Sequence, residues 1–325
     1  MTTLIFSDFE PSDDAYQQIT ALHNRFYPQW PVSVEHMRSG DERREAGRRF
    51  ERTLLRDGDG ALLGYGHVFH APWVDIPDKL FVDVYIEPDL LGTDIEATFL
   101  ARLIERARQV EATSVVSGTY EDRTRRVALL KRYGFELEVR FAKSEQVVAE
   151  FPRERIDAAL ERARSQGITF STEVELRERH SDYVERAWEA AWACEQGMPS
   201  PDPPRQKPLP VFREWLETSP GRIPEATWFA LDGERYVGLT TLERNGTEED
   251  KLGVGFTGVR QGYRRRGIAT ALKSLATAYA QAQGVKVILT TNEESNPMYD
   301  LNVALGFRPT PAWVSFVKPL RSSDP

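Results

Sequence analysis

The stretch Gly253-Val-Gly-Phe-Thr-Gly-Val-Arg-Gln-Gly-Tyr-Arg-Arg-Arg-Gly-Ile-Ala-Thr270 decides how this chain of 325 residues is interpreted. Its first part reads as a strand, and its second part as a basic turn that opens a long helix. Backbone N–H groups and the helix dipole at such a turn attract an anion, and the arginines add positive charge. We therefore predict an anion site here. The simpler alternative is a solvated basic turn before an ordinary amphipathic helix.

The glycines of this stretch also match the dinucleotide-binding pattern G-x-G-x-x-G. That interpretation fails because the glycines lie within the expected strand, no helix opens at Gly258, and no acidic residue follows about 20 positions later. They instead indicate a strand whose backbone is approached closely.

The same succession of elements occurs twice in the chain. Val82 and Phe135 lie 53 positions apart, and so do Val254 and Phe307. Each copy reads as strands, a long strand, a helix, a short buried strand and a second helix. A repeated order at a repeated spacing predicts two copies of one domain. Hairpin turns are expected at the Asp-Gly pairs, namely Asp57-Gly58, Asp59-Gly60 and Asp232-Gly233.

We expect an α+β fold of two tandem domains, each a central mixed sheet flanked by helices. The predicted domains are residues 1–150 and 151–325, with a charged linker helix at about 152–167 whose polar face is solvated. A capping box of Thr93 with Glu96 is expected to start the long helix of the first copy.

Composition excludes several classes of protein. The net charge of −8 and the pI near 5.4 argue against binding nucleic acid or an anionic membrane. The single cysteine, Cys194, permits no intrachain disulfide, and no metal-ligand set is present. No leader-like start and no long apolar run occur, so we expect a cytoplasmic protein, either a monomer or a weak homodimer.

The segment Arg264-x-x-Gly267-x-Ala269 resembles the acetyl-coenzyme A signature of the GNAT superfamily of N-acyltransferases. With Tyr263 before the turn and Leu305-Gly-Phe307 after it, the resemblance covers roughly residues 228–310. The repeat extends the fold weakly over the first copy, as in tandem GNAT proteins of the mycothiol-synthase-like group. The resemblance implies acetyl-coenzyme A as cosubstrate, no metal, and an amine acceptor.

The resemblance also implies a set of cosubstrate-binding residues. The backbone around Thr257, Gly258 and Val259 would pair with the pantetheine arm as if it were an added strand. The pyrophosphate would be held, mainly by main-chain N–H groups, at Arg264, Arg265, Arg266, Gly267, Ile268, Ala269 and Thr270. Asn292 and Asn296 would bond the pantetheine amides, or simply form turns.

Catalytic groups depart from the family pattern. The usual tyrosine acid falls by spacing on Asn302, and Tyr299 is either its substitute or a packing residue. The usual glutamate on the long strand is absent, which leaves Glu243, Glu293 or water as the base; surface charge is the alternative role of both glutamates.

The acceptor is expected beside the helix that starts at Tyr183 and the proline-rich loop after it. Trp192, Glu195 and Met198 are candidates for contact with it, and aromatic packing is the alternative.

We thus expect an acetyl-coenzyme A-dependent N-acyltransferase that acetylates a primary amine of a small-molecule or peptidic substrate. The alternative is a catalytically impaired acyl-coenzyme A-binding sensor or regulatory protein. The first copy has Asp89 and Asp94 where the second has arginines. These carboxylates would repel a pyrophosphate, so we expect no coenzyme A site there, and a role in packing or in shaping the substrate site.

Overall fold

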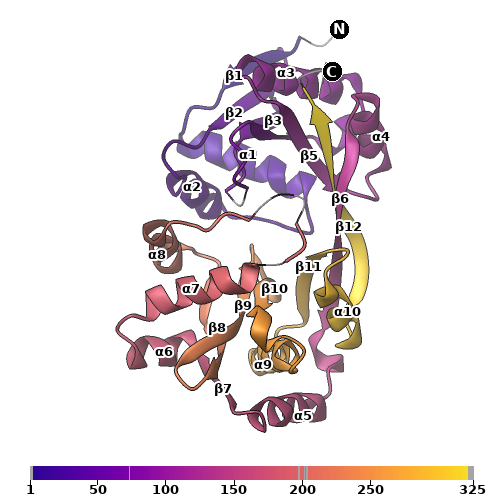
Figure 1. Ribbon diagram of the computed structural model, residues 1–325. Helices are drawn as coiled ribbons and strands as arrows, with labels where there is room; N and C mark the ends of the chain where they lie inside the picture. The colour runs from indigo at the N-terminus through magenta and orange to yellow at the C-terminus, as the bar shows by residue number, and fades with distance from the viewer. Residues whose placement is uncertain (1–2, 73, 197, 201, 203, 321–325) are drawn as a thin grey trace, which may run out of the picture. The chain divides into compact units, whose positions relative to one another are not determined.

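The structure is a computed structural model that describes residues 3–320 except 73, 197, 201 and 203 (Figure 1). The chain divides into two compact units. Unit 1 comprises residues 1–141, 201–205 and 311–325, and unit 2 comprises residues 142–200 and 206–310. Unit 1 therefore contains two pieces of chain that are distant in sequence from the rest of it, whereas unit 2 is nearly continuous. The division at residues 150 and 151 stays a prediction about domains.

The first unit follows the expected order of elements. They are β1 (Ile5–Asp8), α1 (Asp13–Phe26), α2 (Val34–Glu42), β2 (Phe50–Arg56), β3 (Leu62–Phe69), β4 (Lys79–Ile86), η1 (Pro88–Leu90), α3 (Asp94–Gln109), β5 (Ser114–Tyr120) and α4 (Thr124–Arg132). Strand β6 (Glu136–Val147) begins in unit 1 and ends in unit 2. The strand order is β1-β2-β3-β4-β5, and β12 follows β5.

The second unit repeats this order with two additional helices, one before its first strand and one before its second. Its elements are η2 (Val148–Glu150), α5 (Arg153–Arg164), β7 (Ile168–Thr172), α6 (Glu173–Arg179), α7 (Tyr183–Glu195), α8 (Leu209–Thr218), β8 (Arg222–Asp232), β9 (Arg235–Asn245), β10 (Glu248–Val259), η3 (Gln261–Tyr263), α9 (Ile268–Ala282), β11 (Val287–Glu293) and α10 (Pro297–Ala304). Strand β12 (Arg308–Pro319) begins here and passes into unit 1, where Trp313–Pro319 pairs with β5. The strand order is β6-β11-β10-β9-β8-β7.

Both sheets are mixed, as expected. In each copy the long strand pairs in parallel with the buried strand that follows it, β4 with β5 and β10 with β11, while its other edge is antiparallel. Such a parallel pair requires a crossover, and α3 and α9 provide it.

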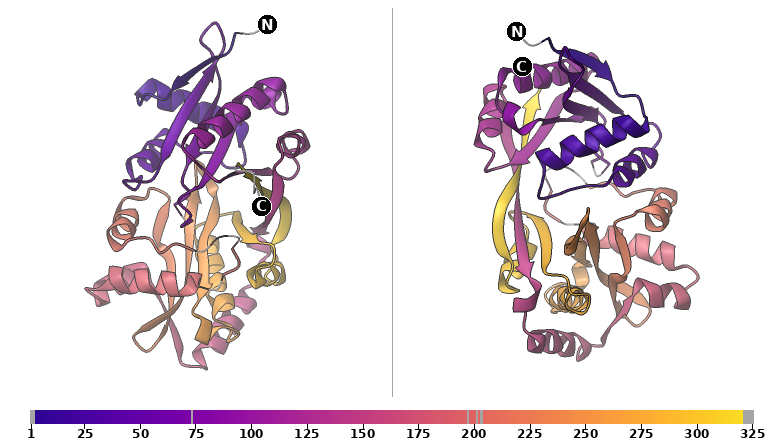
Figure 2. Two further views of the ribbon diagram at one scale, coloured as in Figure 1. Left: turned by 45° about the horizontal axis from the view of Figure 1, so that its top comes forward. Right: turned by 180° about the vertical axis from the view of Figure 1, so that it is seen from behind.

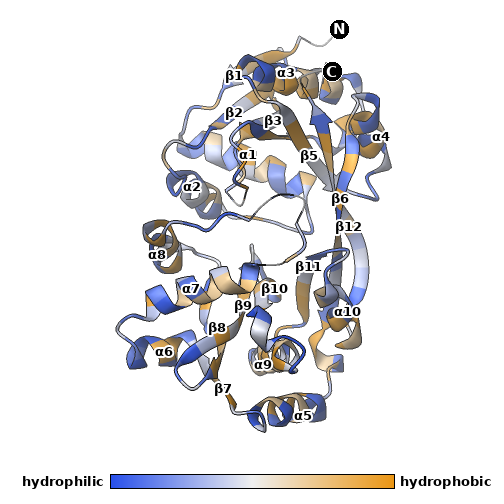
Figure 3. Cartoon of the chain, viewed as in Figure 1, coloured by the Kyte–Doolittle hydropathy of each residue, from blue (hydrophilic) through white to orange (hydrophobic). Residues whose placement is uncertain are grey.

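Helices of unit 2 cover both faces of its strands (Figures 1 and 2). One core joins α5 and α9 to the sheet, and a second core lies under α6, α7 and α8. The expected linker helix is α5, whose Ile156, Leu160 and Ala163 are buried in the first of these cores, although most of the helix is hydrophilic (Figure 3). Its buried side is too narrow to stand out among charged residues in the sequence.

One local prediction is wrong. Thr93 is the N-cap of α3, but its hydroxyl donates to Leu90 O instead of accepting from the helix, so no capping box forms. The Glu96 carboxylate accepts from Gly92 N–H instead, because the loop turns that group toward it. The three Asp-Gly pairs lie in the turns between β2 and β3 and between β8 and β9, as expected. Gly60 and Gly233 take positive φ there, whereas Gly58 does not.

Candidate functional site

Strand β10 parts from β11 near its middle. The two pair only over Lys251–Gly253, whereas β10 stays paired with β9 as far as Val259. Arg260 N–H donates to Val237 O on the β9 side at 2.9 Å. Alternation along an antiparallel strand then turns the N–H and C=O of Thr257 and the N–H of Val259 toward the opposite, open edge, where Val259 O already accepts from Arg264. This edge can accept an extended partner as an additional strand.

A cavity of about 530 Å³ lies beside this edge. Every residue expected to bind the cosubstrate lines it except Arg266 and Asn292, and so does Met198. The cavity wall therefore combines the end of β10, the basic loop, the start of α9 and the start of α10. The lining residues that sequence reasoning missed are Arg162, Cys194, Pro199, Tyr263, Pro297, Met298 and Leu301.

The loop before α9 turns sharply. The backbone φ is +66° at Arg265 and +80° at Gly267. Residues other than glycine rarely adopt this left-handed region. Strain at a non-glycine residue is typical of ligand clamps. Gly267, the N-cap of α9, makes no side-chain cap bond, and the first turn contains no acidic residue. The first N–H groups of α9 thus have no side-chain acceptor from a cap.

Two arginines of the basic loop, Arg264 and Arg266, form hydrogen bonds with other parts of unit 2. Arg264 donates to Val259 O at 3.0 Å and to Gln196 O at 3.0 Å, which ties the end of α7 to the end of β10. Arg266 donates to Gln166 Oε1 at 3.2 Å, and Gln166 Nε2 donates back to Arg266 O at 3.0 Å. These bonds fix the loop between α7 and the C-terminal end of α5.

The cavity also reaches α7 through Cys194. A Cβ at Gly258 would lie 2.7 Å from Cys194 Cβ, so glycine allows α7 to pack closely on β10. The glycines of β10 thus make room for this chain's own side chains. Burial raises the pKa of the Cys194 thiol to about 12, which keeps it protonated at neutral pH.

Glu243 is the carboxylate closest to the bulge of β10. The β9–β10 register shifts between Val254 and Phe256, and Gly255 lies in that bulge. A Cβ at Gly255 would lie 2.6 Å from Glu243 Cδ and 2.7 Å from Thr241 Oγ1. Burial raises the pKa of Glu243, and the positive charges of Arg222 and Lys207 only partly offset this effect.

None of the four catalytic candidates, Glu243 included, lines the cavity, and the other three lie around α10. Asn302 is fully buried, and its Nδ2 donates to Asn292 Oδ1 at 2.6 Å. Glu293 accepts from Ser295 N at 3.0 Å and from Ser295 Oγ at 2.5 Å, as in a turn. Tyr299 is half-buried on α10.

Of the three residues predicted to contact the acceptor, only Met198 lines the cavity. Trp192 and Glu195 are half-buried on α7 and do not line the cavity, whereas Met198 is exposed and does. Burial raises the pKa of Glu195. Asn296 lines the cavity, but its Oδ1 accepts from Met298 N at 3.0 Å and caps α10, so only its amide N–H₂ group is left to donate.

The corresponding loop of unit 1 is closed by an internal carboxylate. Glu96 Oε2 accepts from Gly92 N–H at 2.5 Å, and Glu96 Oε1 accepts from Arg126 at 3.0 Å. Both side chains are buried. Tyr27 packs against Tyr120 and Trp313, with ring centroids 5.6 and 5.8 Å away. In unit 2 we predict that this loop binds an anion of a ligand. In unit 1 the Glu96 carboxylate already bonds to the corresponding loop.

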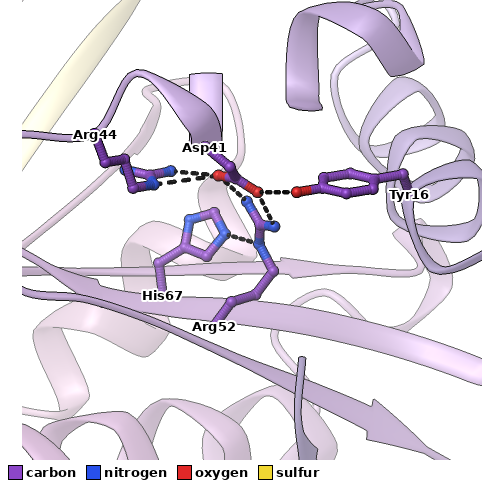
Figure 4. Close-up of polar contacts among 5 residues, drawn as sticks. All are labelled: Tyr16, Asp41, Arg44, Arg52 and His67. Atoms are coloured by element: carbon purple, nitrogen blue, oxygen red, sulfur yellow. Dashed lines mark hydrogen bonds and ion pairs between the residues drawn. The ribbon is translucent and has the colours of Figure 1, made fainter. Parts of the chain in front are cut away.

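Unit 1 also contains a buried polar network that fastens α2 to its sheet (Figure 4). Arg52 donates to both carboxylate oxygens of Asp41, at 2.7 and 3.1 Å, and to His67 Nε2 at 2.8 Å. Tyr16 and Arg44 donate to the same carboxylate. Although burial alone raises the pKa of Asp41, bonds from the two arginines hold it below its ordinary value.

Among the residues that the structure describes, no group of three or more His, Cys, Asp or Glu side chains is arranged to hold a metal ion. None of the helices in the described ranges has the length and apolar character needed to span a membrane.

Comparison with known proteins connects this geometry to a family. Residues 184–307 match the sequence model of the acetyltransferase (GNAT) family. No curated protein matches the chain in sequence.

Solved structures resemble the whole chain. A tandem GNAT protein from the clavulanic acid biosynthesis pathway has a TM-score of 0.73 at 17% identity, over 99% of this chain and 100% of that one. A GCN5-related N-acetyltransferase from Sphaerobacter thermophilus has a TM-score of 0.65 at 20% identity, over 97% and 96% of the two chains. The glucosamine N-acetyltransferase region of a fungal multi-domain β-N-acetylglucosaminidase has a TM-score of 0.69 at 15% identity, over 98% of this chain and 38% of that one. Residues 184–307 thus match the acetyltransferase (GNAT) family model, and the chain as a whole has the fold of tandem GNAT proteins.

Proposed function

We propose that the protein is an acetyl-coenzyme A-dependent N-acyltransferase whose single active site lies in unit 2. The observation that carries this proposal is the cavity between the open edge of β10 and the uncapped N-terminus of α9. The open edge suits the extended, amide-bearing pantetheine arm, and the helix N-terminus suits the pyrophosphate. The acceptor is a primary amine of a small molecule or peptide.

In the proposed reaction the amine attacks the thioester directly. Glu243 takes a proton from the acceptor ammonium, and its raised pKa brings a carboxylate closer to the range in which a general base works well. The amine nitrogen then bonds to the thioester carbon, and the negative charge on the carbonyl oxygen faces Thr257 N–H at the open edge. The nitrogen of the tetrahedral intermediate gives its second proton to water, the C–S bond breaks, and the amide forms. The departing thiolate of coenzyme A takes up a proton from water, or from Tyr299, which solvent then reprotonates.

An acyl-cysteine intermediate is a poor alternative. Cys194 lines the cavity, but a thiol whose pKa is raised to about 12 supplies little thiolate at neutral pH. The thiolate is the nucleophilic form of cysteine. The chemistry of Cys194 therefore supports direct transfer.

One observation favours the alternative of a sensor that binds acyl-coenzyme A without turnover. Asn302, at the position of the usual acid, is buried and bonded to Asn292, and so offers no proton to a leaving thiolate. Titration calorimetry of acetyl-coenzyme A with the full chain, followed by assay of thiol release with a panel of primary amines, tests both proposals. One site per chain with turnover supports the enzyme, and one site without turnover supports the sensor. Absence of binding overturns both, and two sites overturn the assignment to unit 2 alone.

A further inference from the structure

We propose that Arg162, on the helix that precedes the second sheet, binds a phosphate group of coenzyme A. This inference rests on the proposed function and adds a residue that lies outside the segment matched by the family, residues 184–307.

Packing of α5 against α9 brings Arg162 to the site. Leu160 and Ala163 are buried in the core that α5 shares with α9, and the two helices lie side by side (Figures 1 and 2). The bonds between Gln166 and Arg266 fasten the C-terminal end of α5 to the loop before α9. Arg162 lies one turn before Gln166, so its side chain is held next to that loop.

The side chain of Arg162 crosses the start of α9. A Cβ at Gly267 would lie 3.4 Å from Arg162 Cδ and 3.5 Å from Arg162 Nε. Arg162 is also among the residues that line the cavity. Its guanidinium is therefore close to the free N–H groups of the first turn of α9.

The guanidinium of Arg162 has no hydrogen bond or ion pair with any residue that the structure describes, and the side chain is exposed. Arg264 and Arg266, by contrast, donate to carbonyl groups and to Gln166. Arg265 resembles Arg162 in having no such bond. The positive charge available to a ligand thus comes from Arg162 and Arg265, and only the second belongs to the signature.

This placement is unfavourable unless an anion binds. A cation beside a helix N-terminus opposes the helix dipole. Arg162 adds to three arginines of the loop, and the first turn of α9 contributes no carboxylate. In a protein of net charge −8, such a concentration of positive charge fits phosphate groups, which guanidinium binds by charge-assisted hydrogen bonds.

The test is titration calorimetry of coenzyme A with the full chain carrying Arg162→Gln or the matched control Arg164→Gln. Arg164 lies on the same helix, is exposed and does not line the cavity. We expect Arg162→Gln to raise the Kd about tenfold and Arg164→Gln to change it less than about twofold. Repetition with 3′-dephospho-coenzyme A identifies the phosphate: loss of the difference assigns Arg162 to the 3′-phosphate, and persistence assigns it to the pyrophosphate.

Three outcomes count against the proposal. An unchanged Kd in Arg162→Gln, with binding intact in the unmodified protein, overturns the role of Arg162 and leaves the proposed function standing. An equal loss in both variants overturns it as well, because a general change of field then explains the effect. Absence of binding in the unmodified protein overturns the proposed function and this inference with it.

Discussion

Glu243 occupies the space that a side chain at Gly255 would need: a Cβ there would lie 2.6 Å from Glu243 Cδ. The two residues belong to adjacent strands, and Gly255 lies at the bulge of β10. The bulge and the carboxylate are therefore parts of one arrangement, two residues along the strand from the cavity wall at Thr257.

Substitution Gly255→Ala should separate catalysis from cosubstrate binding. The added methyl group displaces the Glu243 carboxylate, so we expect kcat to fall at least about tenfold, because a 1 Å misplacement of a reacting group has large effects. The Kd for acetyl-coenzyme A should change less than about twofold, since Gly255 does not line the cavity. Gly262→Ala is the control, because a Cβ there meets no atom within 4 Å. If kcat is the same in Gly255→Ala and Gly262→Ala, the bulge of β10 does not position Glu243 for catalysis.

Glu243→Gln should abolish the acidic limb of the rate profile. A general base is active when deprotonated, so the rate should rise with pH through a pKa that burial has raised. We expect the variant to lose about 100-fold in kcat and to become insensitive to pH over that range. Measurement of kcat/KM against pH for the two proteins checks this. An unchanged profile would assign the deprotonation to water or to another residue.

Gly267→Asp should prevent coenzyme A binding. The aspartate places a negative charge at the N-terminus of α9, where we propose that the pyrophosphate lies, and we expect an affinity loss of at least about 100-fold. Gly267→Ala is the matched control, because it has the same unfavourable φ without the charge. Asp94→Gly in unit 1 should leave the affinity unchanged. Calorimetric titration of the three variants would contradict the site if Gly267→Asp binds as tightly as Gly267→Ala.

Asp41→Asn should destabilise the protein without loss of coenzyme A binding. It leaves Arg52 buried without its carboxylate partner, which costs about 3 kcal/mol in the free energy of unfolding. The pKa of Asp41 is held below its ordinary value, so its contribution is complete above that ordinary value and is lost as the pH falls through the lowered one. Urea unfolding of both proteins at pH 7 and at pH 3 checks this. The stability difference should shrink at the lower pH, and a constant difference would contradict the assignment.

Lys273→Met should stabilise the protein at neutral pH. Lys273 is buried on α9, its Nζ has no hydrogen-bond partner among the described residues, and burial lowers its pKa to about 7. The unfolded chain binds this proton more tightly, so the penalty is complete below pH 7 and fades as the pH rises toward the ordinary lysine value. We expect the variant to melt about 5 °C higher at pH 7, with a smaller difference at pH 9.5. Thermal melts that differ equally at both values would contradict this prediction.

Local patterns in the sequence predicted much of the fold. The repeat of Val82 to Phe135 in Val254 to Phe307 corresponds to the same succession of strands and helices in both units. The expected helix that starts near Gly267 is α9, which runs from Ile268 to Ala282. These features depend on periodicity and on short stretches of turn residues, which neighbouring positions in the chain encode.

Contacts between segments distant in sequence determined features of the fold that no local sequence pattern predicts. The Glu96 carboxylate that closes the loop of unit 1 was expected to cap its own helix, and its bond to Gly92 follows from the path of that loop. Trp313–Pro319 pairs with β5, nearly 200 residues earlier in the chain, because a strand edge takes whichever segment reaches it.

The sequence alone thus determined the repeat, the order of elements and the strand, basic turn and helix that resemble the GNAT signature. Only the tertiary structure decided which arginines are free to bind a ligand and which carboxylate lies at the bulge. Arg162 and Glu243 show why: each is an ordinary charged residue in its own segment. Glu243 gains its proposed role from Gly255 on another strand, whose missing side chain leaves the space, and Arg162 gains its role from the packing of α5 beside Gly267. Such a vacancy depends on how distant segments pack, and no short window of sequence specifies it.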